Sequence, residues 1–113
     1  LNFPTANFQP KFDEQLLPCT GVYFARGTFG KTWLYGMANL GIRPTFDEND
    51  FVMEIHFFDG KIESLYDQTI EVQFLERIRD EKKFSSAEKL VQQLRKDKKY
   101  CLDRIEVYKQ EKR

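Results

Sequence analysis

Residues 51–58 alternate so strictly between two kinds of side chain that they constrain the fold more than any other stretch. The odd positions are Phe, Met, Ile and Phe, whereas the even positions include Glu54 and His56. Successive side chains of a β-strand point to opposite faces of a sheet, so this pattern predicts a strand with one apolar face. Glu54 and His56 are therefore expected to share the other face.

Three other stretches, rich in aromatic and β-branched residues and bounded by turn residues, are also predicted to be strands. They are Gly21–Arg26, Thr32–Ala38 and Thr69–Glu76. The first two flank a turn at Phe29–Lys31 and predict a hairpin, and the second strand is expected to end in the block Asn39–Phe46. Short strands separated by turns are typical of a small antiparallel barrel.

A helical pattern follows the charged loop Arg79–Phe84. Ser85 and Glu88 have the spacing of a capping box at a helix start. Apolar residues then recur on one helical face, at Ala87, Leu90, Val91, Leu94, Cys101, Ile105 and Tyr108. Only Lys98 interrupts this face. We therefore predict one long helix or two nearly collinear helices, with Asp97 as the cap of the second.

Composition narrows the class of protein. A chain of 113 residues is long enough for one domain with its own core. Its 18 Lys and Arg balance its 18 Asp and Glu, so no basic surface for nucleic acid is indicated. The sequence shows no membrane-spanning apolar run and no signal peptide, and Cys19 and Cys101 lack metal-ligand spacing. We expect a soluble cytoplasmic protein with free thiols.

The opening segment Phe3–Asn7 has the composition of a binding site. Pro4 restricts the backbone and favours an extended segment, on which Thr5 and Asn7 share one face. A hydroxyl and a carboxamide two residues apart suit Mg²⁺, which prefers oxygen ligands and takes others from substrate phosphates. The structural alternative is an edge strand whose Thr and Asn side chains bond nearby backbone.

The two polar residues of the alternating stretch also admit structural interpretations. Glu54 faces either solvent, a partner or a ligand, because an unpaired carboxylate is costly to bury. His56 is the only histidine, and no second nitrogen or thiol ligand lies near it in the sequence. We therefore interpret His56 as structural support.

The segment Ala25–Thr32 fits a permissive phosphate-loop pattern. A phosphate loop opens a helix whose N-terminus faces the phosphate. The residues that follow, Thr32–Gly36, form a poor helix start and a good strand, so we interpret the match as accidental.

A set of motifs occurs along the chain in one order, namely Phe3–Asn7, Gly21–Tyr23, Asn39–Phe46, Glu54–His56, Leu65–Tyr66 and Arg79–Phe84. Together they closely resemble the riboflavin kinase family, and more narrowly the C-terminal kinase module of the bacterial bifunctional riboflavin kinase/FAD synthetase. The resemblance covers residue 1 to about residue 97. It implies a mainly β fold, a closed antiparallel Greek-key β-barrel of about six strands with a C-terminal α-helical segment.

The resemblance also implies an activity, the transfer of phosphate from MgATP to the riboflavin 5′-hydroxyl to give FMN and ADP. In this family pattern Glu54 is the catalytic base, and Thr5 and Asn7 are Mg²⁺ ligands. The implied nucleotide-binding residues are Pro4, Thr5, Leu65 and Tyr66. The implied flavin-binding residues are Arg79, Glu81 and Phe84. Positioning and charge neutralisation do most of phosphoryl transfer, so this set suffices without a phosphate-loop lysine.

The same resemblance divides the chain into a barrel at about 1–78, a flavin-side loop at 79–84 and a helical segment at about 85–111. The chain starts at Leu1 without the glycine-containing segment that precedes the opening motif in the family, so we expect a fragment of a longer protein. It has Asp67 where the family usually has Gly, and the stretch from His56 to Leu65 is one residue longer. The resemblance allows an N-terminal adenylyltransferase domain in the full-length protein. FAD synthesis is not expected from this chain.

Two other functions are compatible with the sequence. One is a flavin- or nucleotide-binding barrel without catalysis, although Thr5, Asn7 and Glu54 together favour the kinase. The other is a small oligonucleotide-binding barrel, which would explain the aromatic strands but requires a basic groove. The balanced charge argues against this second alternative.

The phosphate-loop match can be tested at Lys31, which lies in the predicted hairpin turn. Lys31→Ala should leave FMN formation within a few-fold of the parent rate, because no helix N-terminus is expected beside it. The rate is measured with riboflavin and MgATP by chromatography. A loss greater than about a thousandfold would restore the phosphate-loop interpretation.

Overall fold

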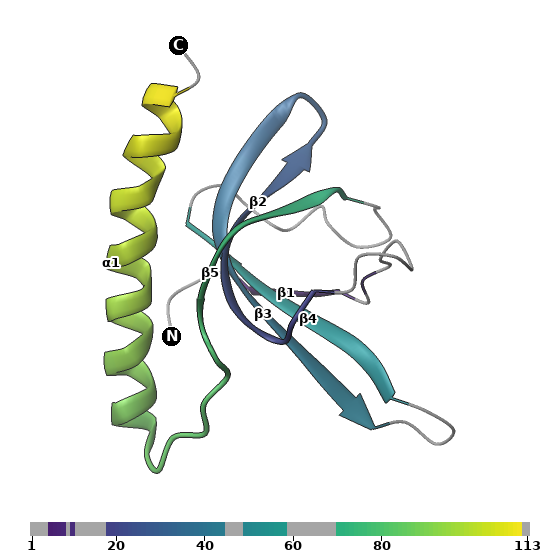
Figure 1. Ribbon diagram of the computed structural model, residues 1–113, viewed down its shortest axis with the longest axis vertical. Coiled ribbons are helices and arrows are strands. Elements are labelled where there is room, and N and C mark those ends of the chain that lie inside the picture. The colour runs from purple at the N-terminus through teal and green to yellow at the C-terminus, as the bar shows by residue number, and fades with distance from the viewer. Residues whose placement is uncertain (1–4, 9, 11–17, 45–48, 59–69, 112–113) are drawn as a thin grey trace. The chain divides into compact units, whose positions relative to one another are not determined.

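The computed structural model describes the chain except for residues 1–4, 9, 11–17, 45–48, 59–69 and 112–113 (Figure 1). Its elements are β1 (Thr5–Phe8), β2 (Gly21–Phe29), β3 (Thr32–Pro44), β4 (Asn49–Phe57), β5 (Val72–Arg79) and α1 (Ala87–Glu111). The strands belong to a compact unit at Asn2–Glu81, and the helix belongs to a second unit at Lys82–Arg113. The protein is thus mainly β with one C-terminal helix, as predicted.

The five strands form one antiparallel sheet in the order β1-β4-β3-β2-β5 (Figure 1). β2, β3 and β4 are consecutive neighbours, and β5 returns to lie beside β2, which is the Greek-key arrangement. A closed barrel of about six strands was expected. Among the described residues there are five strands, and β1 and β5 lie at the two ends of the order without pairing to each other, so this part of the chain does not close.

Four strands extend further than the sequence predicts: β2 continues to Phe29, β4 begins at Asn49, and β3 and β5 also extend at their C-terminal ends. β3 has 13 residues and continues past Ala38, because its C-terminal part from Gly36 to Pro44 pairs with β4. β5 continues through Arg79, which was expected to begin a loop, because Arg79 pairs with Val22 of β2. Pairing with a neighbouring strand therefore overrides the local turn and charge signals at both places.

The predicted hairpin is present. β2 and β3 pair as far as Phe29 and Thr32, which leaves Gly30 and Lys31 as the turn. Gly30 has a φ of 63°, which glycine adopts without steric cost. No helix opens after Lys31, so the structure agrees with our dismissal of the phosphate-loop match.

One face of the sheet carries the main core cluster, although Phe24 and Met37 are buried on the other face. The buried residues of this cluster are Tyr23, Ala25, Ala38, Leu40, Met53, Ile55 and Phe57. Three of them are the odd-numbered residues of β4, so the predicted apolar face of the alternating stretch is confirmed. Phe74 of β5 adds a ring that stacks on Tyr23, with 4.5 Å between the ring centroids. Burial of this face fixes which side of β4 is left for other contacts.

The C-terminal segment is a single helix of 25 residues rather than two. Asp97 lies inside it, where its Oδ1 accepts a hydrogen bond from Gln93 Nε2 at 2.9 Å, so the prediction of Asp97 as a cap was wrong. Cys101 is buried, Cys19 is exposed, and both are free thiols, as predicted. In the described part of the chain, no helix is long and apolar enough to cross a membrane.

The helix start differs by one residue from the predicted capping box. Ser86, not Ser85, caps α1, because the backbone N–H of Lys89 donates to Ser86 Oγ at 3.2 Å. Lys89 is the third residue of the helix, the position whose N–H an N-cap side chain usually satisfies. Because two serines are adjacent, the sequence pattern is compatible with either one as the helix cap.

This assignment predicts different effects of two neighbouring substitutions. Ser86→Ala should lower the free energy of unfolding by about 1 kcal/mol, because it removes the acceptor for an otherwise unpaired helix N–H. Ser85→Ala is the matched control and should change stability much less. Urea unfolding followed by circular dichroism measures both, and an equal or larger loss for Ser85→Ala would contradict the assignment.

Candidate active site

The strand register aligns the candidate site residues in two rows. Asn7 of β1 is directly opposite Glu54 of β4, and Glu54 is directly opposite Asn39 of β3. In the next row, Thr5 is opposite His56. Directly opposed residues of antiparallel strands lie on the same face of the sheet. The backbone therefore brings the predicted Mg²⁺ ligands and the predicted base onto one face, opposite to the core.

Glu54 and His56 contact each other on this face, as the alternation predicts. His56 Nε2 lies 3.3 Å from Glu54 Oε1. Burial lowers the pKa of His56 below its ordinary value, and the charge and hydrogen bond of Glu54 only partly oppose this effect. The imidazole is therefore neutral near pH 7, and with its hydrogen on Nε2 it donates to the carboxylate.

The two side chains differ in exposure. Only 10% of the His56 side chain is accessible to solvent, whereas 49% of the Glu54 side chain is accessible. A buried donor thus holds one oxygen of a carboxylate that a ligand can still reach. This arrangement suits a carboxylate that accepts a proton from a bound hydroxyl, because its orientation is fixed before the ligand arrives.

Asn39 is a member of this row that the sequence analysis did not propose as a site residue. It is exposed, and it lies across from Glu54 on β3. The sequence contained a signal, because Asn39 and Glu54 are equally far along the chain from residues 45–48, which separate β3 from β4. The signal was missed because the residues after Ala38 were expected to form a turn.

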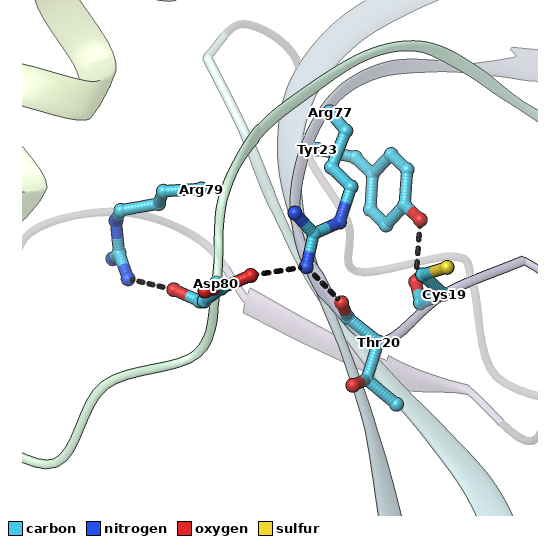
Figure 2. A network of polar contacts seen from close by, with 6 residues as sticks. All are labelled: Cys19, Thr20, Tyr23, Arg77, Arg79 and Asp80. Atoms are coloured by element: carbon cyan, nitrogen blue, oxygen red, sulfur yellow. Dashed lines mark hydrogen bonds and ion pairs between the residues drawn. The ribbon is translucent and has the colours of Figure 1, made fainter.

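The predicted flavin-side residues lie in two different units. Arg79 ends β5, and its Nη1 donates to the backbone carbonyl of Asp80 at 3.0 Å (Figure 2). Glu81 is exposed at the end of the sheet unit, whereas Phe84 is half-buried in the unit that contains the helix. The remaining predicted site residues, Pro4, Leu65 and Tyr66, lie outside the described residues, as does Asp67.

The residue types in the row that contains Glu54 are ones whose oxygen atoms Mg²⁺ prefers as ligands. Within the described ranges, no group of three or more His, Cys, Asp or Glu side chains could hold a metal ion. In the strand register Thr5 and Asn7 are opposite His56 and Glu54, so the backbone places these two residue types on the strand next to the carboxylate. Mg²⁺ commonly binds through few protein oxygens together with water and substrate phosphates. The donor types therefore fit the predicted metal.

These features define a mainly β protein with an oxygen-rich candidate active site beside a Greek-key core. The family model for flavokinase, described as riboflavin kinase, matches residues 1–105. This chain belongs to the riboflavin kinase family. The resemblance found in the sequence is thereby confirmed.

Individual relatives agree with this assignment. The chain is 37% identical to a bifunctional riboflavin kinase/FMN adenylyltransferase of Haemophilus influenzae over 86% of this chain and 31% of the relative. It is 34% identical to the RNA-binding riboflavin kinase RibR of Bacillus subtilis over 95% of this chain and 45% of the relative. The chain spans less than half the length of these relatives.

A solved structure shows the same fold. It is a Streptococcus pneumoniae chain described as a macrolide-efflux protein, with a TM-score of 0.75 and 35% sequence identity. The match covers 86% of this chain and 31% of that chain. The similarity therefore extends over most of the residues that form the sheet and helix.

The buried imidazole gives the site a predicted pH dependence. Because the folded-state pKa of His56 is lower than its ordinary value of 6.5, the unfolded chain binds more protons between the two pKa values. This contribution to stability is present above about pH 6.5 and is lost as the pH falls toward the folded-state pKa.

Urea unfolding of the parent and of His56→Gln, from about pH 7.5 down to about pH 5, measures this contribution. As the pH falls, the free energy of unfolding of the parent should decrease more than that of His56→Gln. Parallel pH profiles for the two proteins would show that His56 does not titrate differently in the folded state.

Proposed function

We propose that this chain is an ATP-dependent riboflavin kinase module that transfers the terminal phosphate of ATP to the riboflavin 5′-hydroxyl, giving FMN and ADP. The observation that supports this function most is the row Asn7, Glu54 and Asn39 across three adjacent strands. This row places the accessible carboxylate of Glu54 next to β1, which carries the proposed oxygen ligands Thr5 and Asn7. Family membership supplies the substrate class.

Glu54 is the proposed base. Its carboxylate accepts the proton of the riboflavin 5′-hydroxyl as the hydroxyl oxygen forms its bond to phosphorus, and the bond between that phosphorus and the ADP oxygen breaks. His56 holds Glu54 Oε1 at 3.3 Å and so leaves the carboxylate oriented toward one face of the sheet. Asn39 contributes a carboxamide beside the carboxylate, where it can bond a substrate hydroxyl.

Thr5 and Asn7 are the proposed ligands of Mg²⁺, which neutralises phosphate charge when it is bound with ATP. Their positions on β1, opposite His56 and Glu54, support this role because they bring phosphate and base to neighbouring strands. Pro4, Leu65 and Tyr66 are proposed to border the nucleotide on the basis of family resemblance. The closed six-stranded barrel and the possible fusion to an adenylyltransferase belong to the same proposal.

Arg79, Glu81 and Phe84 are proposed to face the flavin. Arg79 and Glu81 belong to the sheet unit, where the segment after β5 has defined contacts. The alternative function is a flavin- or nucleotide-binding module without catalysis. Incubation of the chain with riboflavin and MgATP, followed by chromatography, separates the two functions, because only the kinase forms FMN.

Glu54→Gln provides the sharper test of the mechanism. The change keeps the shape of the side chain and removes its ability to accept a proton. Turnover with both substrates saturating should fall by roughly 10²–10⁴, the range for loss of a general base, while riboflavin affinity stays close to that of the parent. Stability should stay close to that of the parent, because Glu54 is exposed and the Gln side chain keeps an oxygen that can accept from His56 Nε2.

The matched control is Glu71→Gln, the same chemical change at an exposed residue beside Thr28, near the β2–β3 turn. This variant should keep parental turnover. If Glu54→Gln also keeps turnover within about threefold of the parent, with its fold confirmed by circular dichroism, Glu54 is not the base. That result would leave the roles of Thr5 and Asn7 to separate tests.

A further inference from the structure

The segment that follows β5 is tied to the start of β2 by a network of polar contacts (Figure 2). Arg77 Nη2 donates to the backbone carbonyl of Thr20 at 2.6 Å and pairs with Asp80 Oδ1 at 2.6 Å. Arg79 Nη1 donates to the carbonyl of Asp80 at 3.0 Å. These contacts fix the direction in which the chain leaves the edge of the sheet.

Gly21 makes this course possible. A Cβ atom at Gly21 would lie 2.7 Å from the carbonyl oxygen of Arg79 and 2.8 Å from Arg77 Nη2. Gly21 also has a φ of 149°, which other residues rarely adopt. A side chain at this position would collide with backbone as well as with the arginine. The segment therefore passes the first residue of β2 at a distance that only glycine permits.

The next residue, Glu81, reaches β3 at a second glycine. A Cβ atom at Gly41 would lie 2.9 Å from Glu81 Oε2 and 3.3 Å from Glu81 Oε1. The carboxylate thus occupies the space that a side chain at position 41 would fill. Gly41 itself is buried, whereas the Glu81 residue is largely exposed. The carboxylate therefore lies close to the strand, although Glu81 as a whole is exposed.

This carboxylate lies on the face that carries Glu54. Gly41 is two residues beyond Asn39 on β3, and the register with β4 is continuous over both positions. Residues two apart on a strand point to the same face, and Asn39 is directly opposite Glu54. Glu81 therefore extends from the segment after β5 across the end of β2 and reaches the candidate active face.

We propose that Gly41 is a positioning residue, whose missing side chain seats the Glu81 carboxylate beside the acceptor substrate. The proposal rests on the proposed kinase function. An ionised carboxylate only accepts hydrogen bonds, so it suits the hydroxyl and N–H groups of a polyhydroxy flavin and repels the phosphates of ATP. Gly41 thereby sets affinity for the phosphate acceptor rather than for the donor.

Gly41→Ala tests this role without threatening the fold. The atoms that a new Cβ would meet belong to the far end of a flexible side chain, so Glu81 can move aside while the strand stays in place. The dissociation constant for riboflavin, measured by fluorescence titration with MgADP present, should rise at least about fivefold. Kinetics should show the same rise in KM for riboflavin, with KM for ATP and kcat within about twofold.

Glu81→Ala and the double variant Gly41→Ala/Glu81→Ala complete a double-mutant cycle for riboflavin binding. Glu81→Ala should weaken riboflavin binding by a similar factor, and Gly41→Ala should add no more than about twofold in its background. Gly30→Ala is the control for backbone strain at a glycine remote from Glu81, because its φ is 63° and nothing lies within 4 Å of its added Cβ. This control should leave riboflavin binding unchanged. Thermal unfolding of all variants confirms that each is folded.

Three results would overturn the proposal. They are a riboflavin dissociation constant for Gly41→Ala within twofold of the parent value, equal weakening of riboflavin and ATP, and additive losses in the double variant. Failure of the kinase function is distinguishable, because it appears as absence of FMN from the parent, whereas the titrations need no turnover. A parent that does not bind riboflavin would refute both.

Discussion

The candidate site depends on the antiparallel register that joins β1, β4 and β3. This register places Asn7, Glu54 and Asn39 in one row on the face opposite to the main core cluster, next to a row in which His56 pairs with the buried Met37. A slip of one residue in β4 would turn Glu54 toward the core and Ile55 toward the ligand side. The buried odd-numbered residues of β4 oppose such a slip, so the same side chains that form the core also hold the carboxylate in place.

The features that follow from local pattern could be predicted from the sequence. Alternation in β4 identified both the core face and the shared face of Glu54 and His56, and the turn at Gly30 and Lys31 followed from residue type. The length of β3 could not be predicted in the same way. Its second half contains Asn, Gly and Pro, which favour turns, and it becomes a strand only because β4 pairs with it.

The same limit explains one finer error and one feature that the sequence does not reveal. The choice of Ser86 over Ser85 as the helix cap depends on where the backbone first adopts helical geometry, and adjacent serines offer the same local signal. The role argued for Gly41 depends on a residue 40 positions away, Glu81, which meets it across the end of β2. A contact made at a glycine leaves no repeating pattern in the sequence, so it can be recognised only from the assembled strands.

Of the strands in this sheet, β1 is expected to detach most easily by local unfolding. It has four residues, and in the described part of the chain it pairs with β4 alone. A short edge strand is held by few hydrogen bonds, so it detaches at a lower free energy than the central strands. If Thr5 and Asn7 bind nucleotide and metal together, only the attached strand binds them well, and the ligand then stabilises that attachment. Attachment of β1 to the sheet and binding of the phosphate donor would then be one coupled equilibrium. The edge strand would be attached more often when the donor is bound than when it is absent.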